Sequence, residues 1–344
     1  MLHSLRLWLY VQRQKRFRQK LLKKILNYTS SEEGRKYREE GEFIAKHGLS
    51  IFPYSFQFRY DPKQILLDYE EGYPFFSYRG KRLFLPNSMP EEKAKSYANS
   101  LLMEQDPESP HSYANAVYSI KSDDILLDIG CGDANFTLEH IDQVKKAFLY
   151  ETDPKWKTPL QKTFQPWKEK VVLSHQRVGF GKNEANLSQM PQLESQSVLF
   201  KIDVDGAERE VLQMLDPLLP KLKKAKVAIC TYHQNKDAEE FQGWFQSRGF
   251  RTAFQNRVIL FHPDTRIQKP FFRPGVLFAY REEKQEEAEG KDKVSSIKYL
   301  VSGIKFLKDI TNKPKHLLPG TLEESTLKPM LVSFVFKILS SSFA

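Results

Sequence analysis

The chain has 344 residues, of which 40% are hydrophobic and 28% charged, as in ordinary soluble globular proteins with one large domain plus extensions, or two domains. Its two cysteines, Cys131 and Cys230, exclude a disulfide framework, and we find no apolar stretch of membrane-spanning length. The net charge is +10, but the first 26 residues hold eight basic residues and no acid, so the rest carries only +2. A basic surface spread over the whole protein is therefore excluded.

Residues 1–28 are predicted to form a basic amphipathic helix. Leu2, Leu5, Leu9, Leu21 and Ile25 fall roughly at helical spacing among the lysines and arginines. Charges recur throughout the segment, unlike the uninterrupted apolar core of a signal peptide. Such a helix can lie on an anionic membrane surface, contact a partner or pack one face on its own domain.

Residues 29–120 are rich in aromatic side chains and turn residues. Tyr78 to Leu85 is predicted to be a hairpin with Arg79 and Gly80 at its turn. Met89 to Met103 is predicted to be a helix with Ser88 as its N-cap. We expect this region to be a lid or substrate-shaping region, or else simply to pack against one edge of a following sheet.

The segment Ile125 to Gly132, ILLDIGCG, is the start of a predicted nucleotide-binding βαβ unit. A buried strand from Asp124 to Asp128 ends in a turn where Gly130 and Gly132 let bare backbone approach a ligand. A helix over residues 133–144 would then direct its unpaired N–H groups at the same pocket. This pattern fits NAD, FAD or S-adenosylmethionine.

The next strand, in Phe148 to Asp153, ends with Glu151, a carboxylate placed to accept hydrogen bonds from both hydroxyls of a ribose. Two details favour S-adenosylmethionine over a dinucleotide. Asn135 stands where a dinucleotide fold has its third glycine, and Asp128 suits a ligand with an ammonium and a sulfonium rather than a pyrophosphate.

Strands and helices then alternate, as in a parallel sheet that is covered on both faces. The predicted strands are 170–175, 197–203 and 225–231, then 250–254, 257–262 and 275–281; the predicted helices are 154–167, 206–215 and 237–248. The domain with this pattern spans residues 121–282. Residues 283–344 are predicted to be a charged linker and a tail without chemistry.

Acids and a histidine follow two neighbouring predicted strands. Asp203, Asp205 and Glu208 come after the fourth strand in KIDVDGAE, and His233 comes after the fifth in CTYHQ. The carboxyl ends of parallel strands meet at one edge of a sheet, so these side chains form a candidate reaction centre. Glu208 can equally be stabilised by the dipole of its helix, and His233 can be an ordinary surface histidine.

KIDVDGAEREVL, together with DIGCGDANF and LYETDPKW, resembles the FkbM family of S-adenosylmethionine-dependent methyltransferases, whose members typically show KxDxEGAE at this place. The resemblance extends over most of the chain. It includes FPYSF, GKRLFLP, EQDPESPHSY, QKTFQPWKEKVV, CTYHQNKDAEE and RPGVLFAYR. Asp205 departs from the pattern because it replaces the more usual glutamate, which shortens its reach by one methylene.

The resemblance implies an α/β class I methyltransferase (Rossmann-like) fold: a seven-stranded, mostly parallel sheet with helices on both faces, its last pair of strands reversed by an antiparallel hairpin, plus an N-terminal α+β extension. It implies S-adenosyl-L-methionine as the cofactor. The implied contacts are Asp128, Gly130, Cys131 and Gly132 around the methionine part, Glu151 on the ribose, Gln176 and Arg177 near the adenine, and Asp203 at the mouth of the active site.

The expected reaction is O-methylation of a sugar hydroxyl on a surface glycan or on its nucleotide- or lipid-linked precursor. In our hypothesis His233 accepts the hydroxyl proton, and Asp203 with Asp205 orients the acceptor. A divalent cation held by Asp203, Asp205 and Glu208 could instead lower the hydroxyl pKa. The cofactor implies a cytoplasmic protein, and the basic helix permits peripheral contact with the inner membrane surface.

Two other functions fit part of the sequence. A nucleic-acid methyltransferase is disfavoured because the positive charge is confined to one helix and no N-P-P-Y-type motif follows the fourth strand, so we expect no nucleic-acid partner. A scaffold that retains the fold without catalysis would not need Gly130, Gly132, Glu151 and Asp203 together. Binding of the cofactor in the absence of an acceptor separates the enzyme from the scaffold.

Overall fold

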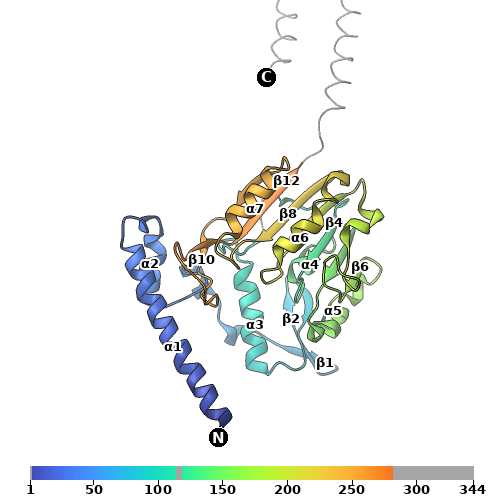
Figure 1. Cartoon of the computed structure of the whole chain (residues 1–344). Helices are drawn as coiled ribbons and strands as arrows, with labels where there is room; N and C mark the ends of the chain where they lie inside the picture. The colour runs from blue at the N-terminus through green and yellow to red at the C-terminus, as the bar shows by residue number, and fades with distance from the viewer. Residues whose placement is uncertain (1, 114–117, 282–344) are drawn as a thin grey trace, which may run out of the picture. The chain divides into compact units, whose positions relative to one another are not determined.

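The computed structural model describes residues 2–113 and 118–281, and Figure 1 shows their course from α1 to β12. The tail predicted over residues 283–344 lies outside this part of the chain. Within the described residues, no helix combines the length and the apolar character that crossing a bilayer requires.

A seven-stranded sheet forms the core, with the order β6-β5-β4-β7-β8-β12-β9. Its strands are β4 (Ile125–Ile129), β5 (Lys146–Tyr150), β6 (Val171–Ser174), β7 (Ser197–Ile202), β8 (Lys224–Cys230), β9 (Arg251–Phe254) and β12 (Val276–Arg281). This is the strand order of a class I methyltransferase fold, so the predicted fold class is confirmed.

One strand of this sheet runs against the others. β12 is antiparallel to both β8 and β9, whereas β4, β5, β6, β7 and β8 pair in parallel. The expectation that both of the last two strands, β9 and β12, are reversed is therefore wrong in one respect. Only β12 is reversed, and β9 points in the same direction as β8. The prediction of a core strand over 257–262 is also wrong: β10 (Val258–Ile259) pairs with β11 (Arg273–Pro274) in a separate two-stranded sheet.

Apolar residues that alternate along the strands pack against helices on each face of the sheet. On one face, Leu126 and Leu199 pack in a cluster with residues of α3, α4 and α5. On the other face, Leu127 and Phe200 pack in a cluster with residues of α6 and α7. The helices are α3 (Glu91–Glu104), α4 (Asn135–His140), α5 (Lys157–Thr163), α6 (Glu208–Leu215) and α7 (Asp237–Gln246). Short 3-10 turns occupy Arg35–Tyr37, Ser55–Arg59, Pro62–Gln64, Pro154–Trp156, Gln165–Trp167, Leu187–Gln189, Pro191–Leu193 and Leu219–Lys221.

The region before the sheet begins with α1 (Leu2–Thr29) and α2 (Arg38–His47), followed by a small antiparallel sheet of β1 (Asp68–Glu70), β2 (Tyr73–Tyr78) and β3 (Lys81–Phe84). The predicted hairpin is confirmed, since Arg79 and Gly80 both take positive φ at its turn. The predicted cap of α3 is wrong: Pro90, not Ser88, precedes the helix, because a proline is tolerated where the first N–H groups have no partner.

Two parts of this region pack on the main body of the protein. Leu21 and Ile25 of α1 are buried against Phe271 and Phe272, so the second half of α1 is docked. Ala94, Ala98 and Leu101 of α3 are fully or nearly fully buried in the same cluster as strand β4. The packing of α3 brings its carboxyl end to the cavity at the edge of the sheet.

Candidate active site

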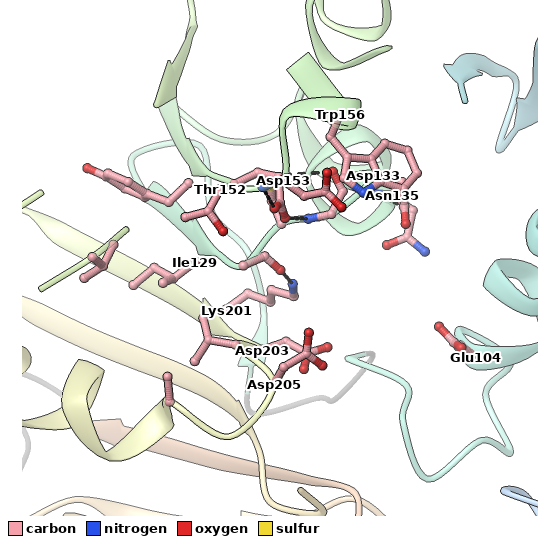
Figure 2. A pocket seen from close by; sticks show the side chains of 18 of the residues that line it. Glu104, Ile129, Asp133, Asn135, Thr152, Asp153, Trp156, Lys201, Asp203 and Asp205 are labelled. Atoms are coloured by element: carbon pink, nitrogen blue, oxygen red, sulfur yellow. Dashed lines mark hydrogen bonds between the residues drawn. The ribbon is translucent and has the colours of Figure 1, made fainter. Parts of the chain in front are cut away.

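A cavity of about 420 Å³ lies at the carboxyl ends of β4, β5 and β7, and residues of α3 close its opposite side (Figure 2). Most of the predicted cofactor residues line it: Gly130, Cys131, Gly132, Glu151, Gln176, Arg177 and Asp203. The predicted Asp205 also lines it, whereas Asp128, Glu208 and His233 are not among its lining residues.

The two glycines after β4 have different reasons to be glycine. Both take positive φ, 70° at Gly130 and 54° at Gly132. A Cβ on Gly130 would lie 1.9 Å from the carbonyl oxygen of Asp203, so Gly130 allows two loops to touch. A Cβ on Gly132 would meet no atom within 4 Å. Gly132 therefore leaves open space beside the backbone, as close approach of a ligand requires.

Glu151, at the end of β5, is held by two backbone N–H groups. Gly132 donates to its Oε2 at 2.8 Å and Asp153 donates to its Oε1 at 2.7 Å. These bonds orient the carboxylate at the cavity wall, and each oxygen keeps a lone pair for a hydroxyl donor. The position and the chemistry fit the predicted contact with a ribose.

Asp133 marks the start of the loop that leads into α4. Its Oδ1 accepts the N–H of Asn135 at 2.9 Å, and its Oδ2 accepts the Tyr97 hydroxyl at 2.8 Å. Ala134 takes a left-handed φ of 58°, so α4 begins at Asn135 and is shorter than predicted. Burial raises the pKa of Asp133 to about 6, although the hydrogen bonds from Tyr97 and Asn135 lower it.

Lys201 is a cavity residue that sequence analysis missed. Its Nζ donates to the carbonyl oxygen of Gly130 at 2.7 Å, a bond drawn as a dashed line beside Lys201 in Figure 2. It also lies 3.1 Å from Oδ1 of Asp128. Burial would lower the pKa of Lys201, but Asp128 and Asp203 raise it above its ordinary range. The available signal was a lysine in strand β7, in which all residues are buried.

The same contacts give Asp128 a role that differs from the predicted one. Its side chain is fully buried, pairs with Lys201 and accepts the Thr137 hydroxyl at 2.7 Å. We therefore assign Asp128 to the support of Lys201 behind the cavity wall, rather than to the direct contact with a ligand ammonium that the sequence suggested. The carboxylate points at Thr137 and Lys201 because both lie beside β4 in the folded chain.

Asp203, directly after β7, is held by two side chains from the region before the sheet. Its Oδ2 accepts the Tyr113 hydroxyl at 3.2 Å and lies 3.5 Å from Nε2 of His111. Burial would raise the pKa of Asp203, but the hydrogen bond from His111 and the charge of Lys201 hold it well below its ordinary value. Asp203 is thus ionised at neutral pH and is a weak proton acceptor.

His233, the predicted base, lies behind Asp203. Its Nδ1 is 2.9 Å from Oε1 of Glu208, and its Nε2 is 3.7 Å from a carboxylate oxygen of both Asp203 and Asp205. Burial alone would lower the pKa of His233. The hydrogen bond to Glu208 and the charge of Asp203 outweigh this effect, so the pKa lies above its ordinary value. Its surroundings thus stabilise an imidazolium, which cannot accept a further proton.

The other two predicted acids have opposite surroundings. Glu208 is fully buried, and its Oε1 accepts the N–H groups of Val204 and Gly206 at 3.2 and 3.3 Å. Asp205 takes a positive φ of 52°, and its side chain is fully exposed at the mouth of the cavity. Glu208 therefore holds the turn after β7, while Asp205 can meet a ligand from solvent.

Three further cavity residues come from the region before the sheet. His111, Tyr113 and Glu104 line the cavity, and His111 Nε2 is 3.2 Å from the Tyr232 hydroxyl. Burial raises the pKa of Glu104 to about 7. His111 and Tyr113 stand in the EQDPESPHSY segment, which sequence analysis used only for the resemblance. No local pattern indicated that this segment reaches the carboxyl ends of the strands.

Two groups of side chains in the described part of the chain have ligand atoms close enough to share a metal ion: His111, Asp203 and Cys230, and Asp203, Glu208 and His233. The predicted set of Asp203, Asp205 and Glu208 is not among them. In the first group, burial raises the pKa of the Cys230 thiol well above its ordinary value, which disfavours the thiolate that metals bind. In the second group, the imidazole of His233 is the group whose surroundings favour protonation. In each donor set a metal ion would therefore have to displace a proton that the surroundings favour.

No family model and no curated protein matches the chain. Solved structures match weakly. The precorrin-6y C5,15-methyltransferase of Geobacter metallireducens GS-15 has a TM-score of 0.34 at 13% identity, over 48% of this chain and 83% of that one. Methyltransferase FkbM of Methylobacillus flagellatus KT has a TM-score of 0.37 at 14% identity, over 55% of this chain and 54% of that one.

An rRNA methylase of Streptococcus thermophilus has a TM-score of 0.33 at 15% identity, over 48% of this chain and 90% of that one. The chain thus spans about half the length of the FkbM structure that it matches. At these scores the matches carry no argument about activity or substrate, which must be argued from the residues of the cavity.

Proposed function

We propose that this chain is an S-adenosylmethionine-dependent O-methyltransferase of the FkbM type. Its acceptor is a sugar hydroxyl of a surface glycan or of a nucleotide- or lipid-linked precursor. One observation carries the proposal: in a class I methyltransferase strand order, the cavity at the strand ends joins the open backbone of Gly132 to the oriented carboxylate of Glu151. An adenosyl ligand needs this combination.

The residues present fit the cofactor along the length of the cavity. Glu151 offers acceptors for the two ribose hydroxyls, and Gln176 and Arg177 line the end predicted for adenine. Lys201 has three ammonium protons, two of which are used on Gly130 and Asp128, so one can meet a ligand carboxylate. The cofactor would supply a methyl group on a positively charged sulfur.

The protein's own part in the reaction is to hold and orient the acceptor. Displacement at a methyl carbon requires the attacking oxygen in line with the sulfur, so positioning supplies much of the rate. Tyr113 and His111 hold Asp203 in place, and the ionised Asp203 can accept a hydrogen bond from a second hydroxyl of the acceptor sugar, beside the one that reacts. Each of the two candidate metal-ligand sets contains a group whose protonated form is favoured, so we derive no step through a metal.

Calorimetric titration with S-adenosylhomocysteine tests the proposal without an acceptor. We expect micromolar binding, unchanged by magnesium. Absence of binding would remove the methyltransferase function and leave a scaffold as the remaining interpretation. A magnesium-dependent affinity would contradict the assignment of the acid groups and reinstate the cation that the sequence permitted.

The basic helix α1 supports a second part of the proposal, peripheral attachment to an anionic membrane surface from the cytoplasmic side. Arg13, Arg16 and Lys20 are exposed, and Trp8 on the same helix is 56% exposed. Each basic residue near an anionic surface contributes on the order of 1 kcal/mol. A lipid-linked sugar would be met at that surface.

Charge reversal tests this attachment better than truncation, because removing α1 would uncover the apolar surface that Leu21 and Ile25 bury. The variant Arg13→Glu, Arg16→Glu, Lys20→Glu should lose co-sedimentation with vesicles that contain phosphatidylserine and keep its binding of S-adenosylhomocysteine. Equal binding of both proteins to these vesicles would contradict the proposal. Stronger binding of the unmodified protein to RNA than to vesicles would favour the nucleic-acid alternative.

A further inference from the structure

The side of the cavity that faces Asp203 carries one carboxylate that the proposed function has not used. Glu104 is the last residue of α3 and lines the cavity opposite Asp203 and Asp205 (Figure 2). Among the residues that the structure describes, none hydrogen bonds to or forms an ion pair with its side chain. A partly buried, unpartnered carboxylate beside a cavity is available to a ligand.

The position of Glu104 in its helix is unfavourable for stability. Carbonyl groups at a helix carboxyl terminus carry partial negative charge, so an acid there is repelled by the helix dipole. The other acids of α3 that lie in its first turn, Glu91 and Glu92, have the favourable placement. The structure therefore gives Glu104 no stabilising role within α3, and its contribution has to come from what enters the cavity.

We infer that Glu104 accepts the proton of the acceptor hydroxyl during methyl transfer, an inference that rests on the proposed function. As the oxygen–methyl bond forms, the sulfur–methyl bond breaks, its electron pair stays on sulfur, and the hydroxyl proton passes to the Glu104 carboxylate. The products are the methyl ether, S-adenosylhomocysteine and the protonated side chain, which returns its proton to water when the products leave.

The other candidates for this role are less suited. Asp203 is held ionised by His111 and Lys201 and has a weak affinity for a proton. His233 does not line the cavity, and Glu208 and Asp203 favour its protonated form. Glu104 has a pKa of about 7, which is near the optimum for a group that takes up a proton at neutral pH.

The charged groups around Glu104 come from several elements. The largest effect on the pKa of Glu104 is burial, which raises it. The charges of Asp133 after β4 and Asp203 after β7 raise this pKa further, whereas those of His111 and Lys201 lower it. Tyr97 of α3 and Tyr232 after β8 also line the cavity. The balance leaves a carboxylate that changes charge close to neutral pH while Asp203 stays ionised.

An acceptor is not needed to test this assignment, because the two forms of the cofactor differ by the methyl group and its positive charge. An ionised carboxylate on the acceptor side attracts the sulfonium of S-adenosylmethionine and not the neutral sulfur of S-adenosylhomocysteine. The ratio of the two dissociation constants, measured by calorimetry between about pH 6 and pH 8, therefore reports the charge of a group near pKa 7.

We expect the preference for S-adenosylmethionine to rise about threefold or more across this range in the unmodified protein. The rise should vanish in Glu104→Gln, which keeps the shape of the side chain. It should persist in Glu92→Gln, a matched change at an exposed site of the same helix. Binding of S-adenosylhomocysteine should be nearly unchanged in both variants. Glu104→Gln should unfold at the same or a higher temperature, because it removes a carboxylate that burial and the helix dipole disfavour.

The outcomes separate this inference from the proposed function. If the unmodified protein binds S-adenosylhomocysteine but its preference does not change with pH, or changes equally in Glu104→Gln, the inference about Glu104 is wrong and the proposed function stands. If the unmodified protein binds neither ligand, both fail. Loss of the pH-dependent preference in Glu104→Gln alone supports the inference.

Discussion

The ammonium of Lys201 lies 3.1 Å from the carboxylate of Asp128, and both side chains are buried beneath the cavity. This ion pair joins neighbouring strands β4 and β7 at the level where the glycine loop begins. Lys201 also donates to the carbonyl oxygen of Gly130, so the pair fixes the loop that forms one wall of the cavity.

Replacing one member of this pair should destabilise the protein strongly. In Lys201→Met the charge of Asp128 is left buried without its partner, which costs about 3–5 kcal/mol of the free energy of unfolding. Urea denaturation measures the loss. The double variant Asp128→Asn, Lys201→Met should recover a large part of it, and Lys168→Met at an exposed site should change little. A loss below about 1 kcal/mol in the single variant would contradict the structural role.

Alanine at the two loop glycines should have different effects. In Gly130→Ala the new Cβ would collide with the carbonyl oxygen of Asp203, so we expect the free energy of unfolding to fall by several kcal/mol, about 2 or more. In Gly132→Ala nothing within 4 Å obstructs the Cβ. The positive φ there costs about 1 kcal/mol, while binding of S-adenosylhomocysteine should be lost.

Thermal unfolding and calorimetry on both variants check this contrast. Normal ligand binding by a stable Gly132→Ala protein would show that no ligand approaches this backbone, and would count against the cofactor position.

Glu151→Gln should weaken the binding of S-adenosylhomocysteine at least tenfold. It should also lower the free energy of unfolding by about 1–3 kcal/mol, because the amide nitrogen cannot accept one of the two backbone N–H groups that Glu151 accepts. The amide keeps the shape of the side chain but loses the negative charge, and a hydrogen bond to a charged group contributes about 1.5–3 kcal/mol. Glu169→Gln, an exposed site outside the cavity, is the matched control. Equal affinities of the two variants would mean that Glu151 holds only the Gly132 loop.

The pH dependence of stability distinguishes a structural His233 from a catalytic base. Its pKa in the folded protein is raised above the ordinary value of 6.5, so the charged ring stabilises the fold fully below that pH. This contribution is lost as pH rises through the higher folded pKa. The difference in unfolding free energy between the unmodified protein and His233→Gln should therefore shrink as pH increases from about 6 to about 9.

Glu208→Gln is the companion variant, because Glu208 is the nearest acid to Nδ1 of His233. It should lower the pKa of His233 and move the pH at which the stabilisation disappears to a smaller value. A stability difference that stays constant or grows with pH would show that His233 is neutral in the folded protein, and would restore the hypothesis that it takes up the acceptor proton.

Much of the part of the cavity that we propose for the cofactor could be predicted because its signals are local. The glycines of the first loop and Glu151 lie within about twenty residues of one another, at the ends of strands that the apolar runs already indicate. Strand order then follows from the short connections and the handedness of parallel units. The direction of each side chain was less predictable: Asp128 points at Thr137 and Lys201, and His233 lies behind Asp203, because neighbouring elements supply their partners.

The sequence by itself determined most strands of the sheet, the glycine loop and the place of Glu151 after β5, since these depend on short-range periodicity and on backbone conformation. Only the tertiary structure decided which other groups line the cavity. Glu104 and His111 precede β7 by about ninety residues. Glu104 reaches the cavity because α3 packs its apolar face on the sheet, and His111 reaches it in the segment that follows α3. Such long-range proximity depends on how whole surfaces fit together, which no local pattern records.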